Sequence, residues 1–499
     1  MRGFVAGLAF VALAALPCRA GPASMQLFSL AGISSRVRRR KFLPFPCAAE
    51  RQPPALSGVR ALVGPYRPRR SPARCWLRSC CCATLGAFAR ALTWPRASQA
   101  VCNDGSAAGY YYAPATSQTD VWLVMLEGGE WCWDAASCAT RAATQSSFMG
   151  NKLWQQTVGL GGIFETDAVK TPFAGAHKVY VPYCSSDAWV GDTDAGGLAF
   201  RGQAIVAAVL RALVVQQNMG GTDRLLFGGC SAGARGAMFN LDYVGGLLAQ
   251  AGAPQVDLRG LLDSPLWIDV APLASAPLSL QCQSQAAVGY LNATARLGES
   301  CLTAYSSPQE HWRCLFGEFR MQFLRTPYGL NANQYDRFQL EYALGGSMPP
   351  EYPNQYIFAD NFGEAMRGVV STLPAAGQAD SGVFSGACFQ HCLVLTELFW
   401  GMQSEGISFS EALRWWFFPG TCPEEDCPGG AVPTQVIEHC DEGFQRCKNK
   451  CTLKHSHKGG KRKPRVPKVY SWHAGMATPP APVVPLACEV GPPAPVLPS

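Results

Sequence analysis

Apolar positions along the chain form two patterns, short continuous runs and longer stretches with a helical period. The short runs predict buried strands at residues 121–126, 178–181, 224–227 and 256–262. Residues 201–217 carry their apolar positions on one helical stripe, and residues 232–249 predict a second helix. Strands that alternate with helices are typical of a mostly parallel α/β sheet. The sequence therefore predicts an α/β fold for the middle of the chain.

The N-terminal segment has the pattern of a secretory signal peptide. Arg2 precedes an apolar run at residues 4–16, and a small residue follows at Ala20. The run is shorter than the roughly 20 residues that a membrane-spanning helix needs. We therefore predict that residues 1–20 are a signal peptide, that no segment spans a membrane, and that the chain is secreted to the extracellular space or cell wall. A secretory-pathway organelle is the alternative location.

Two flanking regions differ from the middle in composition. Residues 21–100 are rich in Arg, Pro, Ala and Cys without a sustained period, which predicts a basic, largely disordered leader and a folded body from about Val101. A pro-segment, a bipartite targeting leader and a misjoined gene are all compatible with this leader, whose role stays open. Residues 419–453 form a Cys-rich extension, and residues 454–499 are basic and then Pro-rich, which predicts a disordered tail.

Charge also separates the ends from the middle. The chain has 499 residues and a net charge of +7. Residues 1–100 contain 16 Lys and Arg with one acid, and residues 454–499 contain seven with one acid, so the segment between them has a net charge of −14. An acidic body with basic ends argues against a nucleic-acid binder, whose basic residues line a folded face.

Cysteine usage favours disulfides over a metal site. The 22 cysteines accompany an export signal, which indicates an oxidising compartment. The extension brings together Cys422, Cys427, Cys440, Cys447 and Cys451, with His439 and His455 nearby. No pair has the tight C-x-x-C spacing of a typical zinc site, so disulfides are the preferred interpretation and no metal is predicted.

The segment Gly229-Cys230-Ser231-Ala232-Gly233 matches the G-x-S-x-G pattern of a nucleophile elbow. A predicted strand leads into it and a predicted helix leads out, which is the context that exposes a serine hydroxyl above a sheet. Side chains at the flanking glycines would clash with the neighbouring strand and helix. An ordinary glycine-rich turn is the simpler alternative, and the flanking elements favour the elbow.

A nucleophilic serine needs a histidine as its base and a carboxylate that orients the histidine. In α/β hydrolases the chain order is serine, acid and then histidine. His391 follows Ser231 by a wide margin and lies inside the body, whereas His311 is a weaker competitor. The acid candidates are Asp263, Asp269, Asp336, Asp360 and Asp380, and spacing alone does not choose between them.

The oxyanion of ester hydrolysis needs hydrogen-bond donors. The N–H group after the nucleophile, at Ala232, is one expected donor. The glycine-rich turn at residues 126–132 follows a predicted strand and is placed to offer the N–H groups of Gly129 and Glu130. A simple tight turn is the alternative.

Motifs in order along the chain resemble the family of plant pectin acetylesterases and Notum carboxylesterases. They are VCNDGS (101–106), LEGGEWC (126–132), PYCSSD (182–187), FRGQ (200–203), the elbow, RGLLDS (259–264), NQYDRFQ (333–339), ACFQH (387–391) and AL (412–413) with Trp416. The resemblance covers roughly residues 101–418 and implies an α/β-hydrolase fold there, with ester-hydrolase activity.

The resemblance also implies roles for single residues. It assigns the triad acid to Asp336 and leaves Asp263 in reserve. It implies three disulfides, Cys102–Cys184, Cys132–Cys138 and Cys301–Cys314. Two positions depart from the family pattern: Glu130 stands where glycine or tryptophan is usual, and Pro265 stands where glycine is usual.

These observations predict a serine ester hydrolase without a cofactor. Ser231 attacks the ester carbonyl, His391 takes its proton, and Asp336 orients His391. The preferred substrate is an O-acetylated polysaccharide. The alternatives are a Notum-like removal of a fatty acyl group from a secreted protein, a serine peptidase, and an inactive hydrolase-fold binding module. The complete set of three residues argues against the binding module.

Overall fold

The computed structural model describes residues 22–30, 99–273, 279–346, 349–447 and 488. The predicted signal peptide, most of the leader, and the predicted tail except Cys488 lie outside the described residues. All described residues belong to one compact unit. Within them, no helix combines the length and the apolar character needed to cross a membrane.

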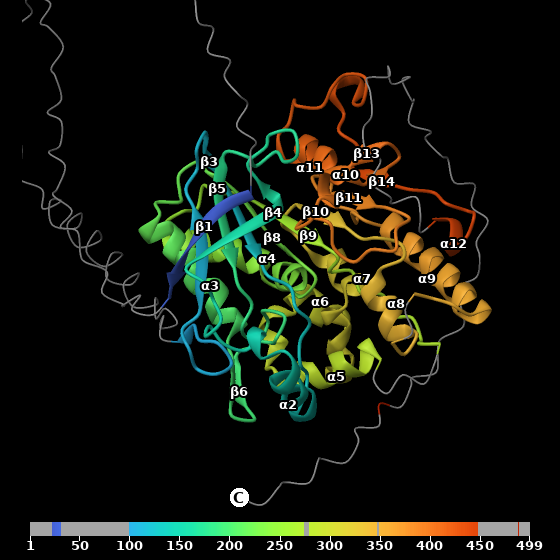
Figure 1. The fold of residues 1–499 in the computed structure, drawn as a ribbon, viewed down its shortest axis with the longest axis horizontal. Helices are drawn as coiled ribbons and strands as arrows, with labels where there is room; N and C mark the ends of the chain where they lie inside the picture. Colours follow the sequence, from blue (N-terminus) through green and yellow to red (C-terminus); the bar gives the residue numbers. More distant parts are fainter. Residues whose placement is uncertain (1–21, 31–98, 274–278, 347–348, 448–487, 489–499) are drawn as a thin grey trace, which may run out of the picture. The chain divides into compact units, whose positions relative to one another are not determined.

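A ten-stranded sheet forms the centre of the molecule (Figure 1). Its strands are β1 (Pro22–Ser29), β2 (Gly109–Ala113), β3 (Gln118–Leu126), β4 (Thr157–Glu165), β5 (Ala176–Val181), β8 (Arg224–Cys230), β9 (Asp257–Asp263), β10 (Tyr328–Asn331), β11 (Gly382–Ser385) and β14 (Gln435–Ile437). Their order across the sheet is β14-β11-β10-β9-β8-β3-β5-β2-β1-β4. The seven strands from β14 to β5 are parallel, and β2, β1 and β4 continue the sheet with antiparallel pairs.

Two small ribbons and a series of helices surround this sheet. The ribbons pair β6 (Thr193–Ala195) with β7 (Leu198–Phe200), and β12 (Gln403–Ser404) with β13 (Ile407–Ser408). The α-helices are α2 (Ala135–Thr144), α3 (Gly202–Gln216), α4 (Ala232–Ala251), α5 (Leu280–Tyr290), α6 (Glu299–Ala304), α7 (Gly317–Arg320), α8 (Arg337–Ala343), α9 (Pro353–Ser371), α10 (Leu398–Gly401), α11 (Phe409–Phe417) and α12 (Phe444–Cys447). Short 3₁₀ helices are η3 (Ser146–Phe148), η4 (Ala293–Arg296), η5 (Pro308–Leu315), η6 (Met321–Phe323) and η7 (Pro428–Gly430).

Helices α4 and α11 cover opposite faces of the sheet. On β9, a side chain at Gly260 would meet Leu241 of α4, so this position faces α4. The next residue, Leu261, belongs to the apolar core that includes Leu413 and Phe417 of α11. Neighbouring strand residues point to opposite faces, so the sheet is buried between the two helices.

The predicted α/β-hydrolase fold is confirmed. The four predicted strands lie within β3, β5, β8 and β9, and the two predicted helices are α3 and α4. Their sequence signal was strong because strands buried on both faces are almost continuously apolar, and α3 and α4 each bury a long stripe.

Besides β2, β4, β10 and β11, which were not predicted within the folded body, two strands of the sheet lie outside the predicted body of residues 101–418. The prediction of a disordered leader is wrong for residues 22–30, because β1 pairs with both β2 and β4 and buries Met25. The predicted end of the hydrolase body at residue 418 is also too early, because β14 extends the sheet beside β11. Strand β14 has only three residues, and the apolar residues of β1 stand in a leader without a sustained period, so neither strand gave a usable pattern.

Seven disulfides join described cysteines to one another. The three implied by the resemblance, Cys102–Cys184, Cys132–Cys138 and Cys301–Cys314, are confirmed. In the extension, Cys422–Cys427 and Cys440–Cys447 confirm the preference for disulfides. Two further pairs, Cys230–Cys392 and Cys282–Cys488, were not predicted.

Candidate active site

Ser231 lies at the sharp turn between β8 and α4. Strand β8 lies inside the sheet, between β9 and β3 (Figure 1). Its backbone has φ 58° and ψ −125°, a left-handed conformation that non-glycine residues rarely adopt. The two elbow glycines are required, because a Cβ at Gly229 would lie 2.6 Å from the Leu126 carbonyl oxygen and one at Gly233 would lie 2.0 Å from it. The local packing therefore forces the turn that presents the Ser231 hydroxyl.

His391 connects Ser231 to Asp336 through two hydrogen bonds. His391 Nε2 lies 2.8 Å from Ser231 Oγ, and Nδ1 lies 2.8 Å from Asp336 Oδ2. Because a carboxylate accepts only, Nδ1 carries the proton and Nε2 is free to accept from the serine hydroxyl. Asp336 is itself fixed as the N-cap of α8, where its Oδ1 accepts the Gln339 N–H at 3.0 Å. The arrangement can therefore remove a proton from Ser231.

The electrostatics of the imidazole suit a base. Burial on its own lowers the pKa of His391, but the charge and the hydrogen bond of Asp336 raise it, and the charges of Asp263 and Glu130 add to this. The net result is a pKa above the ordinary histidine value. The ring of Phe338 stacks on the imidazole with centroids 5.1 Å apart, which fixes the plane of the ring.

Asp263, the second candidate for the acid, does not hydrogen-bond the imidazole. It binds the loop that contains His391 (the histidine loop) through backbone N–H groups. Its Oδ2 accepts the N–H groups of Leu393 and Val394, both at 2.8 Å. Its Oδ1 accepts from Asn331 at 2.6 Å. Desolvation raises the pKa of this fully buried carboxyl, although its donors oppose the rise. Asp263 therefore fixes the backbone that follows His391.

The Cys230–Cys392 disulfide ties the elbow directly to the histidine loop. The two cysteines flank Ser231 and His391 in the sequence, and that adjacency was the signal that could have predicted the pair. Among the described residues, the one cluster of three groups with metal-ligand chemistry is Cys230, Asp263 and Cys392, within 4.8 Å of one another. The two sulfurs are bonded to each other there, so the cluster offers no thiolate to a metal ion.

The glycine loop after β3 packs tightly against the elbow. A Cβ at Gly128 would lie 2.6 Å from the Cys230 carbonyl oxygen. Gly129 and Glu130 both have positive φ, 136° and 60°, which turns this backbone away from the strand direction. The Glu130 carboxylate accepts a hydrogen bond from Gln145 at 3.3 Å.

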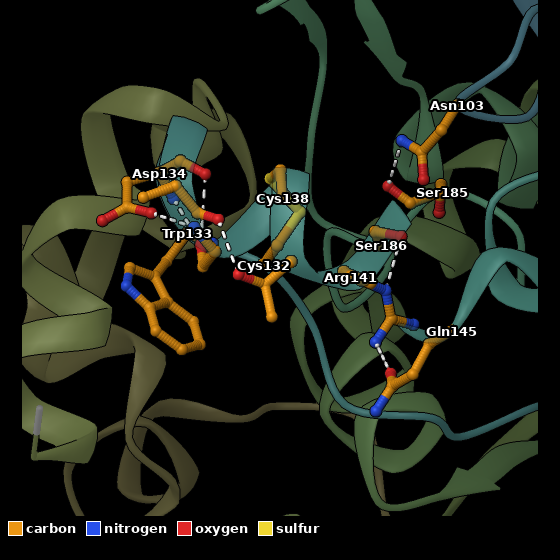
Figure 2. The surroundings of a disulfide bond; sticks show 12 residues. Asn103, Cys132, Trp133, Asp134, Cys138, Arg141, Gln145, Ser185 and Ser186 are labelled. Carbon is orange, nitrogen blue, oxygen red and sulfur yellow. Dashed lines mark hydrogen bonds between the residues drawn. A yellow bond between two sulfur atoms is a disulfide. The ribbon is translucent and has the colours of Figure 1, made fainter. Parts of the chain in front are cut away.

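Two devices hold this loop in place (Figure 2). The Cys132–Cys138 disulfide joins the loop to α2. From the same helix, the Arg141 guanidinium donates to Ser186 Oγ at 2.8 Å. It also donates to the Gly129 carbonyl at 2.6 Å. The loop is thereby held in a fixed position against α2.

An aromatic cluster continues from the glycine loop past the histidine. Trp131 contacts Trp267 edge to face at 5.6 Å, and Trp267 stacks on Phe338 at 5.9 Å. The guanidinium of Arg235, from the first turn of α4, lies over both indoles. Sequence analysis did not single out Arg235, although its position four residues after Ser231 places it on the same helix face.

A central parallel sheet with a serine elbow at one strand end defines an α/β-hydrolase. Residues 89–441 match the model of the pectinacetylesterase family. The palmitoleoyl-protein carboxylesterase Notum of Mus musculus is 30% identical over 358 residues, covering 68% of this chain and 69% of that protein. The corresponding protein of Xenopus laevis, notum1, is 29% identical over 70% of this chain and 72% of its own length.

A solved structure has the same fold. The Wnt deacylase Notum from Drosophila superposes with a TM-score of 0.60 and 27% sequence identity, covering 69% of this chain and 94% of that chain. The chain belongs to the pectinacetylesterase family, and its class is that of the carboxylic ester hydrolases.

Proposed function

We propose that Ser231, His391 and Asp336 form the catalytic triad of this esterase. The observation that carries the proposal is the pair of 2.8 Å hydrogen bonds linking them at the strained elbow. His391 takes the proton of Ser231 as Oγ attacks the ester carbonyl, and Asp336 stabilises the resulting imidazolium. His391 returns the proton to the departing alcohol. A water molecule deprotonated by His391 then releases the carboxylic acid.

The N–H groups of Gly129, Glu130 and Ala232 serve as the oxyanion donors in this mechanism. The rigid attachment of the glycine loop supports the assignment, because donors fixed in advance lose no free energy to reorganisation during the reaction. Ala232 begins α4, so its N–H points out of a helix N-terminus, where negative charge is favoured.

The preferred substrate in this proposal is a polysaccharide that carries short acyl groups, of which acetyl is the smallest. Arg235 supports this choice, because a long alkyl chain lying along Trp131 and Trp267 would meet an unpaired buried cation. The second candidate is removal of a fatty acyl group from a protein, favoured by relatives named palmitoleoyl-protein carboxylesterase. An inactive binding module is disfavoured by the intact hydrogen-bonded triad.

Secretion is part of the proposal. Seven disulfides between described cysteines would not persist in a reducing cytosol. The Cys132–Cys138 and Cys230–Cys392 bonds hold the two loops of the site, so an oxidising compartment is needed for the site as well as for the fold.

A series of p-nitrophenyl esters tests the acyl preference. We expect kcat/KM to be highest for acetate and butyrate and to fall for octanoate and palmitate. In an apolar pocket each buried methylene would instead add about 0.8 kcal/mol of binding. A rise of about tenfold or more from acetate to octanoate, equivalent to roughly 1.4 kcal/mol, would favour the fatty-acyl substrate.

A further inference from the structure

Arg235 is a buried cation one helical turn after Ser231. The residue is 2% exposed, and within the described residues neither Nε nor Nη2 has a hydrogen-bond partner. Burying a cation without an acceptor is costly, and native structures rarely do so without a reason. Burial lowers the pKa of Arg235 to about 9, so the guanidinium is still charged at neutral pH.

The guanidinium lies between two indoles that border the catalytic residues. Its Cζ atom is 3.5 Å from the Trp267 ring centroid and 4.2 Å from that of Trp131. Trp131 directly follows Glu130 of the glycine loop, and Trp267 reaches the imidazole through Phe338. The two indoles stabilise the charge through their ring faces, while the N–H groups of Nε and Nη2 have no partner within the described residues and remain for a planar acceptor such as a carboxylate.

A second buried donor without a partner lies against Trp131. Gln283 of α5 accepts the Trp131 indole N–H with Oε1 at 3.1 Å, and this orients its amide. Its Nε2 then has no hydrogen-bond partner within the described residues, although Gln283 is only 1% exposed. The surroundings of Trp131 thus carry an excess of donors and a positive charge, which is the chemistry that binds an anion.

We propose that Arg235 binds a carboxylate carried by the acyl group of the substrate, so that the enzyme prefers hemiesters of short dicarboxylic acids such as succinic acid. The inference rests on the proposed function, because it takes Ser231 as the nucleophile. Residues four apart on a helix are about 6 Å apart along its axis, and helical side chains lean toward the N-terminus. The guanidinium is therefore within reach of an acyl chain of three to five carbons.

We place the carboxylate on the acyl group and not on the alcohol group, because Arg235 is buried. The alcohol part of a polymeric substrate continues into solvent and cannot end at a side chain that is 2% exposed, whereas an acyl group has a free end. The bond changes stay those of ester hydrolysis. Oγ bonds to the acyl carbon, the alcohol leaves with the proton from His391, and water then releases the dicarboxylic acid.

The test compares ethyl hydrogen succinate with its neutral isostere ethyl 4-methylpentanoate, by measuring the ethanol released. We expect kcat/KM for the hemiester to be higher by at least about tenfold, the effect of a charge-assisted hydrogen bond. Equal or lower values, with ethyl acetate still hydrolysed, overturn the inference alone. Failure to hydrolyse any ester, ethyl acetate included, overturns the proposed function instead.

Arg235→Met is the direct variant, and we expect its preference for the hemiester to fall to about one. Arg296→Met is the matched control, because Arg296 also stacks on an aromatic ring, Tyr243 at 3.6 Å, but lies outside the site. It should keep the wild-type preference. An unchanged preference in Arg235→Met overturns the inference.

Two measurements on the wild-type protein keep the inference testable if Arg235→Met does not fold. Succinate should inhibit ethyl acetate hydrolysis at a concentration at least about tenfold lower than succinamide, the uncharged diamide of the same shape. Equal inhibition contradicts a carboxylate site. Acetoxyacetate places the carboxylate on the alcohol side, and a preference for it over ethyl hydrogen succinate overturns the acyl-side assignment.

Discussion

Ser231 is the residue on which the proposed chemistry depends most directly. Ser231→Ala removes the nucleophile, and we expect kcat for p-nitrophenyl acetate to fall on the order of 10⁶-fold. The thermal midpoint should change little, since the hydroxyl contacts the imidazole and not the core. Residual turnover near the wild-type rate would exclude Ser231 as the nucleophile.

The two buried aspartates near His391 should differ in effect. Asp336→Asn should lower kcat on the order of 10⁴-fold, because an amide favours the wrong imidazole tautomer. Asp263→Asn should mainly lower stability, since Asp263 accepts backbone N–H groups of the histidine loop. Kinetics and thermal unfolding of both variants check this. A larger loss of kcat in Asp263→Asn than in Asp336→Asn would reverse the assignment.

The pH dependence of the reaction should report His391. A general base acts in its neutral form, so kcat/KM should fall as the pH drops through the pKa of His391. Asp336 raises that pKa, which places the fall above the ordinary histidine value. In Asp336→Asn the fall should move to lower pH. Identical acid limbs in the two pH–rate profiles would show that another group controls the rate.

At the scale of single residues, the sequence indicated candidates for the catalytic acid but could not choose among them. Spacing left five aspartates open, and the resemblance selected Asp336, which the structure places on the imidazole. The difference between Asp336 and Asp263 is one of direction, since both are buried and only one faces the ring. Arg235 was not predicted as a site residue. Helical periodicity indicates that a position faces the core, but it does not indicate which side chains the residue contacts there.

At the scale of secondary structure, prediction succeeded where an element carries a continuous or helically periodic run of apolar residues, whereas the 19-residue α9 and the buried β10 were not predicted. The apolar patterns of strands β3 and β8 and of helices α3 and α4 are sufficient to predict these elements. Strand β14 has three residues and lies at the edge of the sheet, so it shows no usable pattern. Its place depends on pairing with β11, a contact between distant segments that local sequence does not encode.

The Cys230–Cys392 bond gives a prediction at this scale, because it joins β8 to the histidine loop across 162 residues. The double variant Cys230→Ala with Cys392→Ala should lose about 2–5 kcal/mol of unfolding free energy and also lose kcat/KM. The control variant Cys301→Ala with Cys314→Ala opens a bond that joins α6 to η5 and holds none of the proposed catalytic residues, so it should affect stability alone. Denaturant unfolding and ester kinetics separate the two results. Full activity without the first bond would show that the triad does not need this tether.

For the whole molecule, β1 joins two parts of the sheet that do not otherwise pair. It lies between β2 and β4, and β4 reaches the sheet only through it among the described strands. Met25 is fully buried in the core, and Phe28 stacks on Tyr110 at 5.4 Å. A segment from the start of the chain therefore closes one end of the body.

A chain that begins at residue 99 should consequently have a lower thermal midpoint, and protease should cut within β4 faster than in the full chain. Without β1 the backbone groups of β4 lose their partners, and an exposed strand edge promotes aggregation. Met25→Glu in the full chain should reproduce the loss, because it places a carboxylate in the core. Ser24→Glu is the control, since Ser24 is exposed on the same strand. Equal stability and equal cleavage of the full and shortened chains would mean that β1 contributes nothing to the folded body in solution.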